Sequence, residues 1–167
     1  MRSAALVILV GIAIPAFALT IEEAYRLIPH QQTVFQSASA RMAAPERAYL
    51  TALFSAIDQA IVARVSARRN STVAQAYAPV WKAWADLKPP AALKGVQDKV
   101  RAAIEDQQAF LLELEKHQTN ADLNHPKVRS SSGNLQAAYA DLMRMYPGEN
   151  ATNKQAFFDY LCALDFV

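Results

Sequence analysis

The chain has 167 residues, is 53% hydrophobic and carries 17 basic against 15 acidic side chains, which gives a formal net charge of +2. This length suits one domain with its own core, and near neutrality argues against nucleic acid as a partner, because that binding depends on neutralising many phosphates. The single cysteine, Cys162, excludes a framework of internal disulfides, so stability has to come from buried apolar surface.

Residues 1–18 have the pattern of a secretory signal. Arg2 supplies a positive charge, an apolar run covers 4–14, and the Ala-Phe-Ala motif at 16–18 is a small-x-small site for signal peptidase. The apolar run is shorter than the roughly 20 residues of a membrane-spanning helix. The sequence therefore predicts a cleaved signal at 1–18 and one domain at 19–167. We expect the product to be periplasmic or secreted, and soluble without a membrane anchor.

The segment after the signal is predicted to be helical but interrupted. Thr20 and Glu23 form a capping box, which is typical of a helix start. Pro29 should end that short helix. Residues 30–44 are expected to form a further helical segment. The apolar residues that it would place on one side are Val34, Phe35, Ala38 and Met42.

The rest of the chain shows apolar residues at helical spacing, with scarce glycine and abundant alanine. Five amphipathic helices are predicted, over 45–68, 72–87, 91–117, 126–146 and 152–165. Such helices, joined by short loops, bury their apolar faces against each other. The expected fold is all-α: an antiparallel four-helix-bundle-like domain with an additional short C-terminal helix and an N-terminal helical segment.

Motifs of common catalytic chemistry are missing from the sequence. It contains no Cys-x-x-Cys-His, His-Glu-x-x-His, Ser-x-x-Lys or Gly-x-Ser-x-Gly motif, and its glycines are dispersed. This favours a protein that is not an enzyme. A basic run, Arg64, Arg68 and Arg69, is interpreted as cations opposing the negative end of a helix.

A polar residue interrupts the apolar face of two predicted helices. Gln107 falls on the apolar face of one helix, and Ser131 or Ser132 falls on that of the next. In antiparallel neighbours these positions would lie within about one helical turn of each other. A buried amide needs hydrogen-bond partners, so we expect a polar layer inside the bundle, with His30 as a further member. The layer would either fix the helix register or form the floor of a ligand pocket.

An aromatic strip lies on the predicted helix 72–87. Tyr77, Trp81 and Trp84 recur at spacings of four and three residues and so share one face. The structural interpretation is that they fill the core, because tryptophan buries a large area. The functional interpretation is a platform for a sugar, a peptide or a partner helix.

Three further residues suggest metal or thiol chemistry. His30 and Met143 could supply the two axial ligands of a noncovalent haem, or bind copper, if facing helices brought them to one height. Cys162 is expected to be a buried apolar filler, with a disulfide-linked homodimer as the alternative.

The favoured hypothesis is an exported, non-catalytic module without a cofactor that binds an unknown periplasmic protein or a small ligand. Its candidate ligand-binding residues are Gln107, Ser131, Ser132, Trp81 and Trp84. The alternative is a haem- or copper-binding bundle that handles metal or electrons.

Overall fold

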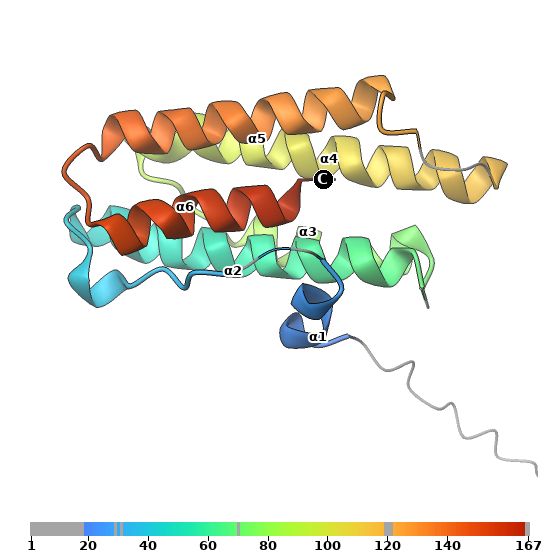
Figure 1. Ribbon diagram of the computed structural model, residues 1–167, viewed down its shortest axis with the longest axis horizontal. Helices are drawn as coiled ribbons and strands as arrows, with labels where there is room; N and C mark the ends of the chain where they lie inside the picture. The colour runs from blue at the N-terminus through green and yellow to red at the C-terminus, as the bar shows by residue number, and fades with distance from the viewer. Residues whose placement is uncertain (1–18, 29, 31, 70, 119–121, 166–167) are drawn as a thin grey trace, which may run out of the picture.

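Figure 1 shows the computed structural model of the chain, which describes residues 19–28, 30, 32–69, 71–118 and 122–165. Within these ranges the structure contains six α-helices, two 3-10 helices and no strand. The fold class is all-α, as predicted. The proposed signal at 1–18 lies outside the described residues.

The long helices lie where the apolar periodicity predicts them, to within a few residues at each end. The elements are α1 (Ile21–Arg26), η1 (Ser37–Ser39), α2 (Ala44–Ala67), α3 (Val73–Ala85), η2 (Ala91–Leu93), α4 (Lys94–His117), α5 (Pro126–Met145) and α6 (Ala151–Leu164). Thr20 and Thr72 each begin a helix with a capping box, and the Asn150 side chain accepts a hydrogen bond from the first turn of α6. These caps satisfy amide groups that have no partner inside the helix.

The helices alternate in direction along the chain. α2, α4 and α6 run one way, and α3 and α5 run the other way (Figure 1). α4 packs against α5, α2 packs against α3, and α6 contacts both α2 and α5. This arrangement is compatible with the predicted antiparallel bundle. The C-terminal helix is central to the packing, because the side chains of Phe157 and Leu164 on α6 are fully buried.

α2 is a long apolar helix that is largely buried in the bundle. Among the described residues, it is the one helix long and apolar enough to cross a membrane, but 61% of its most apolar stretch is buried inside the fold. Its inward face carries Leu50, Leu53, Ile57 and Ile61, all fully buried. This burial is typical of a core helix in a packed domain.

The predicted helix over 30–44 is wrong. The described part of this segment is irregular apart from η1, and residues 32–43, here called the strap, run beside α6 (Figure 1). The backbone N–H groups of the strap donate hydrogen bonds to side chains of α6 and of the residue preceding its N-cap, in place of a helical ladder. The pairs are Thr33 N with Asp159 Oδ2 (2.9 Å), Gln36 N with Asn153 Oδ1 (2.8 Å) and Arg41 N with Glu149 Oε2 (2.7 Å).

One side chain anchors the strap in the core. Phe35 is buried between Phe54 of α2 and Phe157 of α6, with ring centroids 5.4 and 6.0 Å away. Val34 and Ala38, expected on the same side as Phe35, are exposed. Neighbouring residues point to opposite sides of an extended backbone, which separates Val34 from Phe35.

A buried carboxylate joins α1 and the strap to α2. Asp58 of α2 is 9% exposed, and its Oδ1 accepts hydrogen bonds from Tyr25 Oη at 2.9 Å and Gln32 Nε2 at 3.0 Å. Burial raises the pKa of Asp58 to about 6, although both hydrogen bonds act to lower it. At neutral pH the folded protein therefore carries a buried negative charge, and no basic side chain among the described residues forms a salt bridge with it.

Asp58→Asn is expected to stabilise the protein at neutral pH. The folded state holds the Asp58 proton more tightly than the unfolded chain does, so this residue's contribution to stability is fully present below about pH 4 and is lost as pH rises through about 6. Asparagine cannot ionise and still accepts both hydrogen bonds. Urea unfolding at pH 8 should show a free energy of unfolding about 1–3 kcal/mol higher than wild type, and the gain should vanish near pH 4.

The control is Asp106→Asn on α4, which removes one carboxylate that is only half-buried. It should change stability little at either pH. A gain for Asp58→Asn that is equal at pH 4 and pH 8 would contradict the assignment of the charge penalty to Asp58.

Candidate functional site

The predicted polar layer exists between α4 and α5, and it reaches a third helix. Gln107 and Ser131 are fully buried, and Gln107 Nε2 donates to Ser131 Oγ at 3.2 Å. The same amide nitrogen donates to the carbonyl oxygen of Leu164, the last residue of α6, at 2.6 Å. Gln107 Oε1 is buried and has no hydrogen-bond partner among the described residues. The layer therefore binds the end of α6 to the α4–α5 pair.

Arg64 completes the binding of this helix end. Its guanidinium donates to the carbonyl oxygens of Ala163 (2.8 Å), Leu164 (2.9 Å) and Asp165. These carbonyls have no partner within α6, so they accept from a side chain of another helix. Arg64 does lie at the negative end of a helix, as interpreted from the sequence. That helix is α6, whereas Arg64 itself belongs to α2. Burial lowers the pKa of Arg64, which Tyr77 and Asp165 partly oppose.

Ser132 connects this layer to the molecular surface. Its hydroxyl donates to Oδ1 of Asp165, the C-cap residue of α6, at 2.5 Å. Asp165 is 8% exposed, and its side chain lines a groove between α5 and α6. One of the two expected serines thus lies inside the layer, and the other fixes a carboxylate at the edge of a groove.

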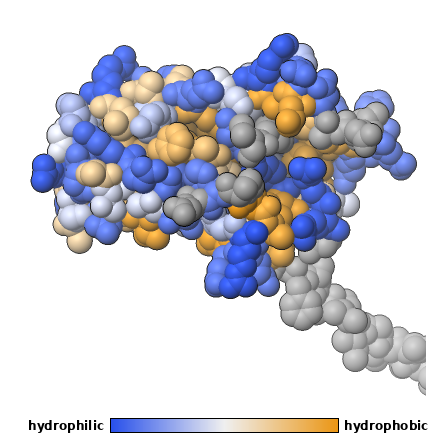
Figure 2. Space-filling model, in the orientation of Figure 1, coloured by the Kyte–Doolittle hydropathy of each residue, from blue (hydrophilic) through white to orange (hydrophobic). Residues whose placement is uncertain are grey.

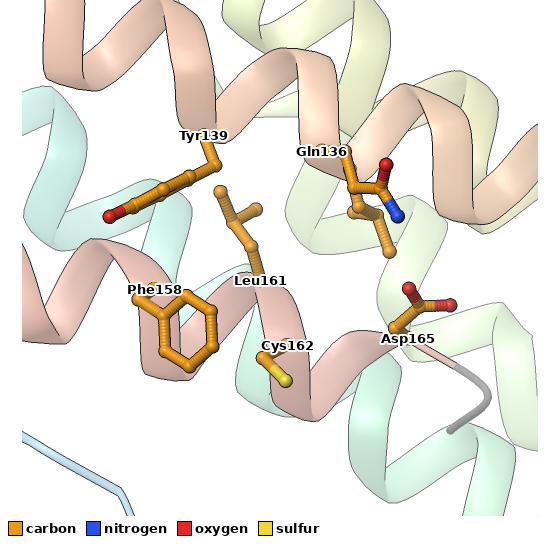
Figure 3. Close-up of a pocket in the computed structure, with 7 residues that line it drawn as sticks. Gln136, Tyr139, Phe158, Leu161, Cys162 and Asp165 are labelled. Carbon is orange, nitrogen blue, oxygen red and sulfur yellow. The ribbon is translucent and has the colours of Figure 1, made fainter.

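The groove is the candidate functional site. It has a volume of about 240 Å³ and is lined by Leu135, Gln136, Tyr139, Phe158, Leu161, Cys162 and Asp165. Figure 3 shows Gln136 and Tyr139 descending from α5 toward Phe158, Leu161 and Cys162 of α6, with Asp165 at the end near Gln136. The face that carries α6 shows small apolar areas divided by polar side chains (Figure 2). The site is thus a small groove and not a broad apolar surface.

Cys162 is half-buried in the wall of this groove, not enclosed in the core as predicted. Burial raises the pKa of its thiol, and the carboxylates of Asp165 and Asp159 raise it further. Since the thiolate is the nucleophilic form, this environment disfavours nucleophilic chemistry at Cys162.

The aromatic strip mainly fills the core. Tyr77 is fully buried and Trp84 is 4% exposed, whereas Trp81 is half-buried. Trp81 Nε1 donates to Gln108 Oε1 at 2.7 Å, and the Arg101 guanidinium lies 5.9 Å from the Trp81 ring centroid. The two tryptophans therefore contribute to packing between α3 and α4 and do not form an open platform.

His30 and Met143 have separate surroundings. His30 Nε2 lies 3.6 Å from Asp159 Oδ1 on α6, and its ring is 6.2 Å from that of Phe158. It does not join the layer around Gln107. Met143 packs against the core from α5. Within the described ranges, no group of three His, Cys, Asp or Glu residues is placed to bind a metal ion.

A second hollow, of about 420 Å³, lies between the start of α1 and the helices α2 and α3. Its lining includes Leu19 to Ile21, Gln59, Ser66 and Pro79. One wall depends on the residues directly after the predicted cleavage site and on the six-residue helix α1. The α5–α6 groove has walls on two long helices that the polar layer fixes, so it is the better-defined site.

Comparison with known proteins finds no matching family model, no similar curated protein and no similar solved structure. The sequence identified Gln107 and the serines because they interrupt apolar stripes. It did not identify Gln136, Tyr139 and Asp165 as groove residues. It identified Arg64 as a cation at a helix end, but not that this helix is α6.

Arg64→Lys is expected to destabilise the protein strongly. A lysine ammonium cannot reproduce the planar fork that reaches three carbonyls, and it would leave buried acceptors without partners. The free energy of unfolding in urea should fall by about 2–4 kcal/mol. Arg69→Lys, at an exposed position near the end of the same helix, is the control and should unfold like wild type. Equal midpoints for the two variants would show that Arg64 does not stabilise the end of α6.

Proposed function

We propose that this protein is an exported, non-catalytic binding module whose site is the groove between α5 and α6. The observation that carries the proposal is that the groove has apolar walls and, at one end, a polar side chain held in place by a hydrogen bond. Leu135, Phe158 and Leu161 supply the walls, and Asp165, oriented by Ser132, supplies the polar end. Small-ligand sites combine these two features: apolar burial gives affinity, and a few placed polar groups give orientation.

The rigidity of the groove supports this proposal. α5 is paired with α4 along its length, and the end of α6 is bound by Arg64 and Gln107. A ligand would therefore meet walls that are already in place, which reduces the ordering required on binding. The volume of about 240 Å³ suits one small molecule or one large side chain of a partner protein. We favour the small ligand, because the polar side chain at the end of the groove, Asp165, is largely buried.

Export is the second part of the proposal, and it rests on residues 1–18. In a bacterial host, the periplasmic product is expected to begin at Leu19, which an intact-mass measurement would detect. Ala18→Arg should leave the precursor uncleaved, because signal peptidase requires a small residue there. Phe17→Ser, at the tolerant middle position, is the control and should be processed normally. A full-length protein that remains in the cytoplasm would contradict export.

A neutral apolar dye tests the groove directly. N-phenyl-1-naphthylamine, whose fluorescence rises when it leaves water, is expected to bind the wild-type protein. Cys162→Phe places a ring in the groove and should weaken dye binding at least tenfold. Cys162→Ala leaves the groove open and should bind the dye as wild type does.

Thr152→Phe adds an aromatic ring at an exposed position on α6 outside the groove, so it controls for added apolar surface. Near-identical dye binding by Cys162→Phe and Cys162→Ala would mean that the dye binds elsewhere and would remove the groove as the site.

A further inference from the structure

The surface formed by α5, α6 and the strap carries uncharged side chains. α6 lies between α5 and the strap (Figure 1), and it contacts both. We call this surface the neutral face and define it by Val34, Gln136, Tyr139, Gln155, Phe158 and Cys162, which are exposed or half-buried. The outward side of α4 differs, because it carries exposed ion pairs such as Lys94–Asp98. Depletion of charge together with aromatic side chains is typical of the centre of a protein–protein interface.

Ionisable side chains next to the neutral face are covered or turned away from it. Asp159 and Asp165 are at most 8% exposed, and both accept hydrogen bonds from neighbouring residues. Lys154 Nζ donates to the carbonyl oxygen of Pro147, in the connection between α5 and α6, at 2.5 Å. The side chain of His30 is 18% exposed, and its Nε2 lies 3.6 Å from Asp159 Oδ1. Two copies of the residues that define this face can therefore meet without bringing like charges together.

A projection and a hollow lie side by side on the neutral face. Phe158 is 43% exposed at the edge of the α5–α6 groove, and its ring meets that of Tyr139 edge to face with centroids 5.7 Å apart. The groove has a volume of about 240 Å³ and apolar walls that include Leu135 and Leu161. Cys162 lies in the groove wall one turn after Phe158 (Figure 3). One surface thus presents both an exposed aromatic ring and a space of suitable size for such a ring.

We infer that the neutral face joins two copies of this chain about a two-fold axis, with Phe158 of each copy inserted into the α5–α6 groove of the other. A two-fold interface uses the same surface on both copies, so that surface must contain a projection and a hollow that match. The amides of Gln136 and Gln155 each offer donors and an acceptor, so they can pair with the same residues of the second copy. Because the face is small, the dimer is expected to be weak and concentration-dependent.

The inference goes beyond the proposed function, since it stands on the shape and charge of the neutral face and not on a ligand. It also gives the proposed site a form of regulation. The Phe158 ring of the second copy and a small ligand would occupy the same groove, so each excludes the other. A ligand that binds the groove of the single chain must then shift the protein from dimer to monomer.

The experiment is sedimentation equilibrium of the protein purified from the bacterial host. The average mass should rise from that of one chain toward that of two between about 5 and 500 µM, the range expected for a small interface. Phe158→Lys should weaken the dimer at least about a hundredfold, because the symmetric interface loses the inserted ring twice. Leu112→Lys replaces an equally exposed apolar residue, 42% exposed on α4 and outside the neutral face, and should dimerise as wild type does.

A second pair of variants changes the hollow and not the projection. Cys162→Phe fills the groove and should weaken the dimer at least about tenfold, by excluding the ring of the second copy. Cys162→Ala keeps the groove open and should dimerise as wild type does. Circular dichroism establishes that each variant is folded. If Phe158→Lys does not fold, the two Cys162 variants decide.

Saturating N-phenyl-1-naphthylamine provides the last measurement, because it should convert the wild-type dimer to monomer. A dimer that Phe158→Lys and Cys162→Phe both weaken, and that the dye dissociates, supports the inference. A wild-type protein that stays monomeric, a dimer that Phe158→Lys retains, or a dimer that stays intact with the dye bound overturns it. Dye binding by the dilute single chain tests the proposed function separately: a monomer that binds the dye leaves that function standing without the dimer.

Discussion

The rest of the structure depends on how the end of α6 is bound inside the bundle. A helix that ends among other helices leaves carbonyl groups that water cannot reach, and each such group without a partner is unfavourable. Arg64 from α2 and Gln107 from α4 donate to these carbonyls, and Ser132 from α5 donates to the C-cap side chain. Three helices are thereby attached to the same point, and the position of α6 between α2 and α5 follows from it.

The groove follows from this attachment. Since the end of α6 is fixed by main-chain carbonyls, the side chains one and two turns earlier are held at a fixed height against α5. Leu161 faces inward, and Phe158 and Cys162 face the groove, where Tyr139 and Gln136 meet them from the opposite wall. Hydrogen bonds in the interior thus position the walls of a groove at the surface.

The sequence predicts those features that depend on local spacing. Apolar periodicity, N-caps such as Thr20 and Thr72, and a proline in the first turn such as Pro126 identify the helices. The interruption at Gln107 identifies the polar layer. The strap could not be predicted in this way, because its backbone bonds to Asp159, Asn153 and Glu149, which lie more than a hundred residues later in the chain. The role of Arg64 was missed for the same reason: nothing local shows that the helix end it binds is that of α6.

The surroundings of Cys162 disfavour nucleophilic chemistry at its thiol. A nucleophilic thiol requires a lowered pKa, and Cys162 has a raised one, because burial and two carboxylates act on it in the same direction. Asp165 accepts a hydrogen bond from the Ser132 hydroxyl. It is also the C-cap residue of α6, so its position is part of the packing of the helix end. Moving the Asp165 side chain would disturb the helix end to which α2, α4 and α5 are attached.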